Sequence, residues 1–265
     1  MSVLGRLSAW VSWQRVSVHA FRIKQPRRET VIVSMYAVFY VFAAAIIGYL
    51  IKHNPIPILN SASFTDDVWY ALVFKIGLLL IVPAIWFFLQ GYHIRDLLPD
   101  WKLRFKSVLW MIIAYIAGLS LNLLQGHFDY ILGAAGRFST GSLAARIALG
   151  VVLPLFMAGI PEEVVYRGGL QTRLELLLGR GAAIGITVLL FTAWHLPTRF
   201  LLSQGVEGRA GDLGSVLLGT GVPVLMVGLV FGILWDRYRS LPPLIALHWG
   251  IDTLPTVISL LGVAY

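Results

Sequence analysis

The chain has 265 residues, of which 58% are hydrophobic and only 13% are charged, and its mean hydropathy is +0.79. Soluble domains carry about 25% charged residues, so this composition, with its long apolar runs, indicates an integral membrane protein. The absence of cysteine excludes disulfides, thiolate metal sites and a cysteine nucleophile. The net charge of +8 favours basic cytoplasmic loops in contact with anionic lipid, and we expect no nucleic-acid partner.

The first 30 residues are predicted to form an interfacial amphipathic segment. Apolar residues recur there at roughly helical spacing among six basic ones, and Trp10 and Trp13 suit the headgroup level of a bilayer. An ordinary solvated helix is the alternative. Residues 31–265 show no internal repeat or second domain and are predicted to form a single transmembrane bundle.

Seven apolar segments, each near the roughly 20 residues that cross a bilayer, predict an all-α polytopic transmembrane helix bundle. They cover about Val31–Ile51, Val68–Gln90, Ser107–Leu124, Leu143–Gly159, Ala182–Leu202, Val216–Trp235 and Leu241–Val263. A re-entrant or overlooked helix would raise the number to eight. Prolines are places where these helices could break or kink, and they occur at Pro154, Pro161, Pro197 and Pro223.

The distribution of Lys and Arg predicts how the bundle sits in the membrane. If the N-terminus is cytoplasmic, the inner segments hold fifteen of these residues, and the outer loops hold only Lys52, Arg137, Arg199 and Arg209. The N-terminus is therefore predicted to be cytoplasmic, with the end of the fourth span near the cytoplasmic surface. A cysteine-free chain without a retention signal favours a bacterial plasma membrane over the endoplasmic reticulum.

Few titratable side chains fall within the apolar spans, where a charge at a helix centre costs roughly 2.5–3.5 kcal/mol. They are Lys75, Arg146, Glu162, Glu163, Arg167, His195, His248 and Asp252. Glu163 and Arg167 are four residues apart in the order that favours an ion pair on a helix, so we interpret this pair as structural. Glu162 points about 100° away from that pair and has no partner in its own helix.

An unpaired carboxylate in an apolar site is suited to act as a general base, which makes Glu162 the candidate. The alternative is that both carboxylates simply reach cytoplasmic water. Two histidines lie in later spans: His195 comes one helical turn after Phe191, and His248 shares a face with Asp252. Taken alone, His195 would more often be a buried core histidine, and Asp252 a partner that orients an imidazole.

The combination of these groups is more informative than each of them alone. Helix bundles gather polar groups inward because lipid excludes them, so a carboxylate and two imidazoles from three spans are expected to surround one wet cavity. Such a set can activate water and stabilise an oxyanion, which is the equipment for hydrolysing an amide without a serine or cysteine nucleophile.

Three motifs in this order resemble those of the CPBP intramembrane proteases, also named the Abi family, which includes the type II CAAX prenyl endopeptidases. They read Glu162-Glu163-Val164-Val165-Tyr166-Arg167, Phe191-Thr192-Ala193-Trp194-His195 and His248-Trp249-Gly250-Ile251-Asp252. The resemblance covers about residues 145–255, and the earlier spans match only as hydrophobic helices. Each motif alone has little specificity, whereas the three in order on separate apolar helices are specific.

The resemblance implies a glutamate-dependent intramembrane endopeptidase. We expect it to require no cofactor, because Glu162 cannot easily be both a metal ligand and the base. Glu162 would polarise the water that attacks the scissile carbonyl, and His195 would help to hold that water. His248 and Asp252 would form the oxyanion site. The supporting residues would be Glu163, Arg167 and Phe191.

Two points in this implied mechanism stay open. The family more often has asparagine at the last motif position, and ionised Asp252 cannot donate a hydrogen bond, so it is either protonated or orients His248. A metalloprotease is the alternative mechanism, with zinc held by Glu162, His195 and His248.

The implied partners are the lipid bilayer and a peptide or protein substrate, either prenylated or embedded in the membrane. The sequence identifies neither the substrate nor a lipid-accepting groove. A non-catalytic membrane protein for bacteriocin immunity, scaffolding or chaperoning is an alternative on the same fold. A transporter that uses Glu162, His195 and His248 as a proton relay is a third hypothesis.

Counting residues along the spans leaves one conflict. From the cytoplasmic side, His195 would lie roughly 10 Å deeper than His248, with Glu162 near the surface. For the three side chains to meet, either the helix that carries Glu162 dips back into the membrane after Pro161, or the fifth span starts later than predicted. We expect a break near Gly159-Ile160-Pro161.

Overall fold

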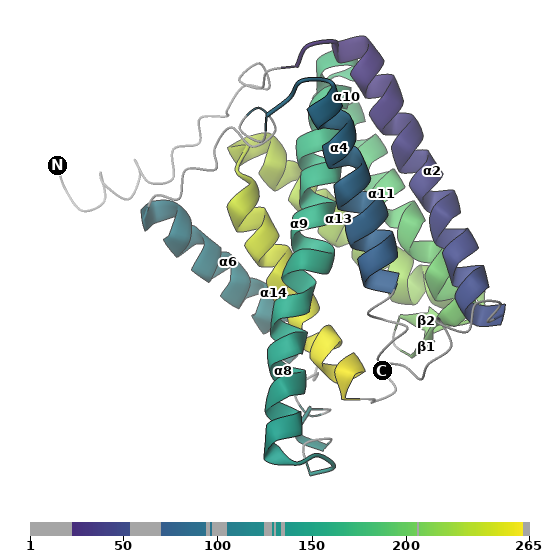
Figure 1. Cartoon of the computed structure of the whole chain (residues 1–265), viewed down its shortest axis with the longest axis vertical. Coiled ribbons are helices and arrows are strands. Elements are labelled where there is room, and N and C mark those ends of the chain that lie inside the picture. The colour runs from purple at the N-terminus through teal and green to yellow at the C-terminus, as the bar shows by residue number, and fades with distance from the viewer. Residues whose placement is uncertain are drawn as a thin grey trace.

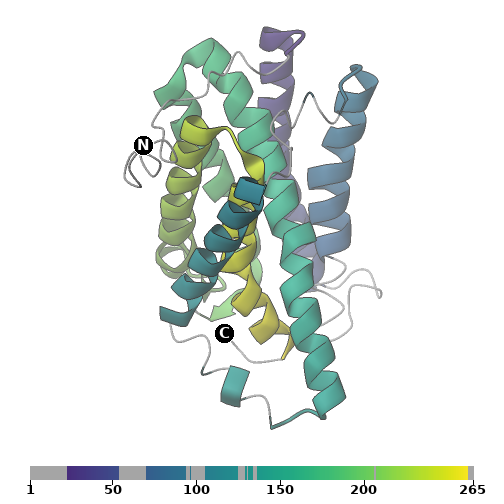
Figure 2. The same cartoon turned by 90° about the vertical axis from the view of Figure 1, so that its left-hand side faces the viewer.

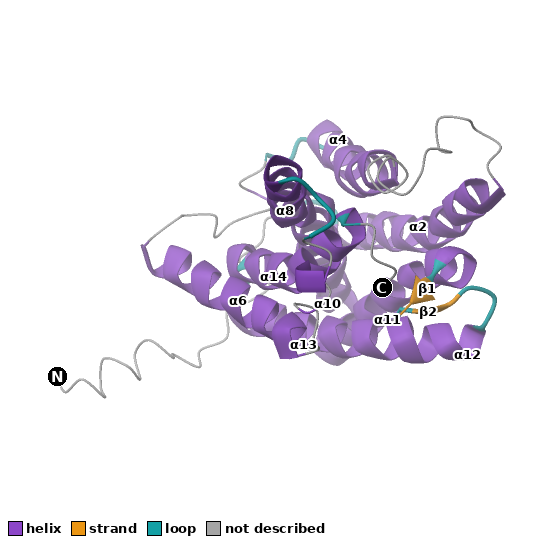
Figure 3. Cartoon of the chain, turned by 90° about the horizontal axis from the view of Figure 1, so that it is seen from below, coloured by secondary structure: helices purple, strands orange, loops and turns teal. Residues whose placement is uncertain are grey.

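The structure is a computed structural model that describes residues 23–53, 70–93, 96, 105–124, 129, 131–133, 136–205 and 207–261. Helices make up nearly all of this part of the chain, as the purple ribbons of Figure 3 show, and the predicted all-α class is confirmed. A two-stranded antiparallel hairpin is the exception: Gln204 pairs with Arg209 and Gly205 with Gly208. Of the predicted interfacial segment 1–30, residues 1–22 lie outside the described residues.

The elements follow one another along the chain as shown in Figure 1. They are α2 (Pro26–His53), η3 (Tyr70–Ile81), α4 (Val82–Leu89), α6 (Phe105–Leu124), α8 (Thr140–Pro154), η4 (Leu155–Gly159), α9 (Ile160–Glu162), η5 (Glu163–Gln171), α10 (Thr172–Leu178), α11 (Arg180–Leu202), β1 (Gln204–Gly205), β2 (Gly208–Arg209), α12 (Leu213–Val216), η6 (Leu217–Gly221), α13 (Val222–Tyr238) and α14 (Leu241–Leu260), where η denotes a π-helix.

Four helices in the described part are long and apolar enough to cross a membrane, which indicates an integral membrane protein. They are Pro26–His53, Thr140–Leu178, Arg180–Leu202 and Leu213–Tyr238. Two shorter apolar helices, Phe74–Leu89 and Val108–Asn122, correspond to the second and third predicted spans. The predicted number of seven spans is not shown.

The fourth predicted span belongs to a continuous helical run of 39 residues, Thr140–Leu178. It extends along the length of the molecule in Figures 1 and 2. The expected break is absent, since Gly159 (φ −52°, ψ −52°) and Ile160 (φ −72°, ψ −56°) are both helical. The prediction of a break was therefore wrong. Glu162 lies well inside one long helix, 16 residues before its end.

The helices continue through several prolines because each of these prolines follows a π-helical segment at the same spacing. The last π residue and the proline two positions later are Ile81 with Pro83, Gly159 with Pro161, and Gly221 with Pro223. Proline cannot donate to the carbonyl four residues earlier, and its ring crowds that carbonyl. A π turn, with bonds over five residues, widens the backbone just before the ring and relieves this conflict.

Close contact of α14 with α6 fixes the direction of the helix that carries His248. A Cβ added at Gly250 would collide with the Tyr115 carbonyl oxygen and would lie 3.0 Å from the Leu119 nitrogen. Asn122 Nδ2 donates to the Ile251 carbonyl oxygen over 2.7 Å. Only glycine permits this backbone approach, so Gly250 sets how deeply α14 sits in the bundle.

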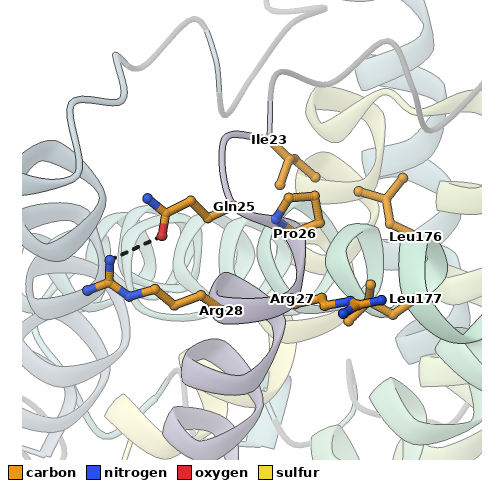
Figure 4. A pocket seen from close by; sticks show the side chains of 7 residues that line it. All are labelled: Ile23, Gln25, Pro26, Arg27, Arg28, Leu176 and Leu177. Carbon is orange, nitrogen blue, oxygen red and sulfur yellow. Dashed lines mark hydrogen bonds between the residues drawn. The ribbon is translucent and has the colours of Figure 1, made fainter.

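The end of the bundle where α2 begins is held by buried ion pairs. Arg173 forms one with Glu29 (3.0 Å), which also accepts a hydrogen bond from the Tyr92 hydroxyl (2.5 Å). An open cavity of about 720 Å³ lies at the same end, lined by Ile23, Gln25, Pro26, Arg27, Arg28, Leu176 and Leu177 (Figure 4). Leu176 comes 14 residues after Glu162, about 20 Å along the helix, so this cavity is separate from the candidate site.

Candidate active site

Glu162 is the centre of a cluster of polar side chains inside the bundle. Its carboxylate is 1% exposed. Oε1 contacts the ammonium of Lys75, on η3, at 3.0 Å. Oε2 faces Nε2 of His195 at 3.9 Å and Nε2 of His248 at 3.6 Å. These two distances exceed that of a direct hydrogen bond, but a water bound to Oε2 would also be within reach of both imidazoles.

The imidazole of His195 is oriented so that its Nε2 faces Glu162. Its Nδ1 is 2.7 Å from the Phe191 carbonyl oxygen, one helical turn earlier. Because a carbonyl only accepts, Nδ1 carries the hydrogen, and the Nε2 that faces Glu162 bears a lone pair. The ring also packs on Trp194, with centroids 3.8 Å apart, and lies edge-on to Phe191. These contacts hold the tautomer and the orientation of His195.

Glu163 joins the structural ion pair to the second histidine. Its Oε1 is 3.0 Å from Arg167 Nη1, as the spacing of four residues predicts, and also 2.7 Å from Nδ1 of His248. Both Glu163 and Arg167 are fully buried. With Nδ1 donating to Glu163, the ring of His248 is fixed so that Nε2 points toward Glu162. Glu163 therefore orients His248 as well as neutralising Arg167.

Asp252 also lies beside His248, but on the side of Nε2. Its Oδ2 is 3.6 Å from Nε2, and its side chain is 34% exposed. An orienting carboxylate would contact Nδ1 of His248, but Nδ1 is hydrogen-bonded to Glu163 instead. Asp252 thus borders the same space as Glu162 Oε2, at its more exposed edge.

Aromatic rings surround the buried guanidinium of Arg167. Its Cζ lies 4.2 Å from the ring centroid of Phe191 and 5.2 Å from that of Phe231. Phe191, a supporting residue in the motif, therefore contacts Arg167 with its ring and His195 with its carbonyl oxygen. Such packing keeps water from the ion pair and stabilises the cation.

All the side chains singled out in the three motifs thus come together, from the long helix Thr140–Leu178 (the central helix), α11 and α14. The depth conflict disappears because the central helix continues past Pro161 and carries Glu162 into the bundle. Sequence reasoning noted Lys75 as an ionisable residue in an apolar span but assigned it no role. Its presence at membrane depth was the signal that could have placed it in the site.

No group of three or more His, Asp or Glu side chains within the described ranges has an arrangement that could hold a metal ion. The ammonium of Lys75 on Oε1 of Glu162 also opposes a second cation at this carboxylate. The alternative zinc ligands Glu162, His195 and His248 are not among such groups in the described ranges, and no step below passes through a metal.

Residues 143–254 match the sequence profile of a known family, described as type II CAAX prenyl endopeptidase, Rce1-like. This part of the chain is therefore a domain of that family, as the resemblance over about residues 145–255 predicts. No curated protein and no solved structure matches the chain significantly. Membership in this family implies a peptidase that acts on protein substrates. The buried network of Glu162, Glu163, His195 and His248 is compatible with its active site.

Proposed function

We propose that the protein is an intramembrane endopeptidase in which Glu162 activates the attacking water. The observation that carries the proposal is the position of Oε2, 3.6 and 3.9 Å from the Nε2 atoms of His248 and His195. A carboxylate oxygen between two imidazole nitrogens provides a base and two groups that can orient a water molecule.

In the proposed reaction, a water molecule gives a proton to Oε2 of Glu162 as its oxygen bonds to the scissile carbonyl carbon. The Nε2 lone pair of His195 accepts a hydrogen bond from the other hydrogen of this water and so orients the molecule. The carbonyl π electrons move to oxygen, where His248, as an imidazolium whose Nδ1 hydrogen is held by Glu163, donates a hydrogen bond from Nε2. The C–N bond then breaks, and the proton on Glu162 passes to the leaving amine.

Known magnitudes make this set of groups sufficient for catalysis. A placed general base contributes about 10²–10⁴ in rate, and one oxyanion donor about 10²–10³. Asp252 Oδ2 is 3.6 Å from Nε2 of His248, which supports the proposal that a protonated Asp252 assists as a second donor to the oxyanion.

The proposed substrate is a protein with a prenylated C-terminal segment, and the membrane is where this substrate meets the site. The family to which residues 143–254 belong supports a prenylated substrate. The location of Glu162 inside a long apolar helix supports access from within the bilayer. Comparing the peptides in strains that carry the wild type or Glu162→Ala would identify the uncleaved substrate.

His195→Ala tests the catalytic function against the non-catalytic alternative. The purified variant is expected to fold, to bind a farnesylated, internally quenched CAAX peptide and to cleave it about 10² times more slowly than the wild type. A non-catalytic scaffold or immunity protein predicts instead that this variant still complements a deletion strain. Undiminished turnover by His195→Ala would remove the proposed mechanism.

We further propose that the reaction is metal-free. Glu162 cannot easily be both a ligand and a base, and Lys75 already occupies one of its oxygens. Purified activity should therefore resist chelators, and metal analysis should find no stoichiometric zinc. Reversible loss of activity on chelation, restored by zinc, would contradict this.

A further inference from the structure

Lys75 contacts the candidate base from outside the family domain. It lies on η3, whereas the matched segment begins at residue 143. Its side chain is 17% exposed, and its Nζ is 3.0 Å from Oε1 of Glu162. A charged lysine in an apolar helix has a high free-energy cost, and such residues are usually paired or take part in function.

A second contact fixes the direction of the lysine side chain. Nζ lies 5.4 Å from the ring centroid of Trp194, the residue whose ring packs on His195. The cation thus lies against both the carboxylate and the aromatic neighbour of the first histidine. Because η3 is a π-helix, a geometry often found at functional sites, the position of Lys75 on it is set by an unusual backbone.

The charges around the site show why this contact matters. The guanidinium of Arg167 is 3.0 Å from Glu163, and that pair is enclosed by aromatic rings. The ammonium of Lys75, in turn, forms an ion pair with Oε1 of Glu162. The two oxygens of Glu162 therefore have different surroundings: an ammonium at Oε1, and two imidazole nitrogens at Oε2.

We propose that Lys75 is a positioning residue of the reaction: its contact with Oε1 of Glu162 holds the carboxylate so that Oε2 faces the two histidines. This inference rests on the proposed function and assigns to it a residue outside the three motifs. Loss of the ammonium would remove the cation from Oε1 and would let the carboxylate rotate, so catalysis should fall while substrate binding persists.

The absence of cysteine from the chain allows a direct test by chemical replacement. Lys75→Cys has a single thiol, which an aminoethyl methanethiosulfonate converts into a side chain with an ammonium, and a propyl methanethiosulfonate into a neutral one of similar size. Using the farnesylated quenched peptide in nanodiscs, we expect kcat of Lys75→Cys to be about 100-fold below wild type, with KM nearly unchanged. Aminoethylation should raise kcat at least about tenfold, and propylation should not.

Two further variants make the result independent of labelling. Lys75→Arg keeps the cation and should be more active than Lys75→Met, while Lys52→Met, at an exposed lysine of α2, should behave as the wild type. Activity of Lys75→Met near that of the wild type would overturn the inference, as would equal recovery with both labels. If Glu162→Gln is inactive while Lys75→Met is fully active, only the role of Lys75 fails. If Glu162→Gln is active, the proposed function fails.

The contact itself is tested without a substrate. Lys75→Met should lower the melting temperature in nanodiscs because it leaves Glu162 without its cation. In a Glu162→Gln background the same change should have a smaller effect, since no charge then needs compensation. Strictly additive effects of the two substitutions would show that the residues are uncoupled and would overturn the inference whether or not the peptide is cleaved.

Discussion

At the scale of single residues, Glu163 has one contact that its sequence spacing predicts and one that it does not. The spacing of four residues predicted its pair with Arg167, because that spacing places two side chains on one face of a helix. Its bond to His248 joins residues 85 apart, and no local rule contains that contact. The same holds for Lys75 and Glu162, 87 residues apart. The motif side chains were thus predictable, but not the partners that orient them.

The buried pair of Glu163 and Arg167 should contribute strongly to stability. Glu163→Ala leaves a fully buried guanidinium without its carboxylate, so we expect the free energy of unfolding to fall by about 3–5 kcal/mol. Unfolding in SDS measures this. The matched control is Glu207→Ala, whose carboxylate is 41% exposed in its pair with Arg199, and the expected loss there is at most about 1 kcal/mol. Equal losses in the two variants would contradict the assignment.

At the scale of elements, apolar runs predicted the ends of the other spans within about five residues, because lipid-thick hydrophobic segments have few alternatives to a helix. The fourth helix was the exception, since it continues beyond Gly159 to Leu178. The continuity of the central helix was not predictable from Pro161 by the usual rule for proline. That rule describes α-helices, whereas a π turn precedes Pro161 here, and the sequence carries no clear mark of such a turn. The wrongly predicted break near Gly159-Ile160-Pro161 follows from this single misjudged proline.

The crossing of α6 and α14 gives a prediction at this scale. Gly250→Ala would place a Cβ against the backbone at Tyr115 and Leu119, and we expect a loss of about 1–3 kcal/mol in the free energy of unfolding. A Cβ at Gly185, on α11, meets no atom within 4 Å. Gly185→Ala should therefore be neutral or stabilising by up to about 1 kcal/mol. Comparable stability of Gly250→Ala and the wild type would show that α14 moves freely across α6.

At the scale of the whole molecule, a group of basic residues lies at the end of the bundle where α2 and α11 begin: Arg27, Arg28, Arg173, Arg180 and Arg239. Composition predicted a helical membrane protein, and the motifs predicted its family domain. The number of spans did not follow from hydropathy alone, because α14 has the length of a span but carries polar site residues and is extensively buried in the bundle. Hydropathy reflects contact with lipid, whereas α14 is covered largely by other helices of the protein.

We propose that this basic end faces the cytoplasm, in a bacterial plasma membrane. Single cysteines test the orientation, because the wild-type chain has none. Gly181→Cys, at the start of α11, and Gly141→Cys, at the start of α8, are exposed positions where a side chain meets no atom within 4 Å. An impermeant maleimide should label Gly141→Cys on intact cells and Gly181→Cys only after lysis. The reverse pattern would invert the topology.

The central claim is that Glu162 is the base, and its most direct test is the turnover of Glu162→Gln. This variant keeps the size of the side chain but removes the basic oxygen. Measured in nanodiscs on the farnesylated quenched peptide, its kcat should be about 10²–10⁴ times below that of the wild type, with the peptide still bound. A kcat within about twofold of the wild type would contradict the claim, since general-base catalysis cannot survive that exchange.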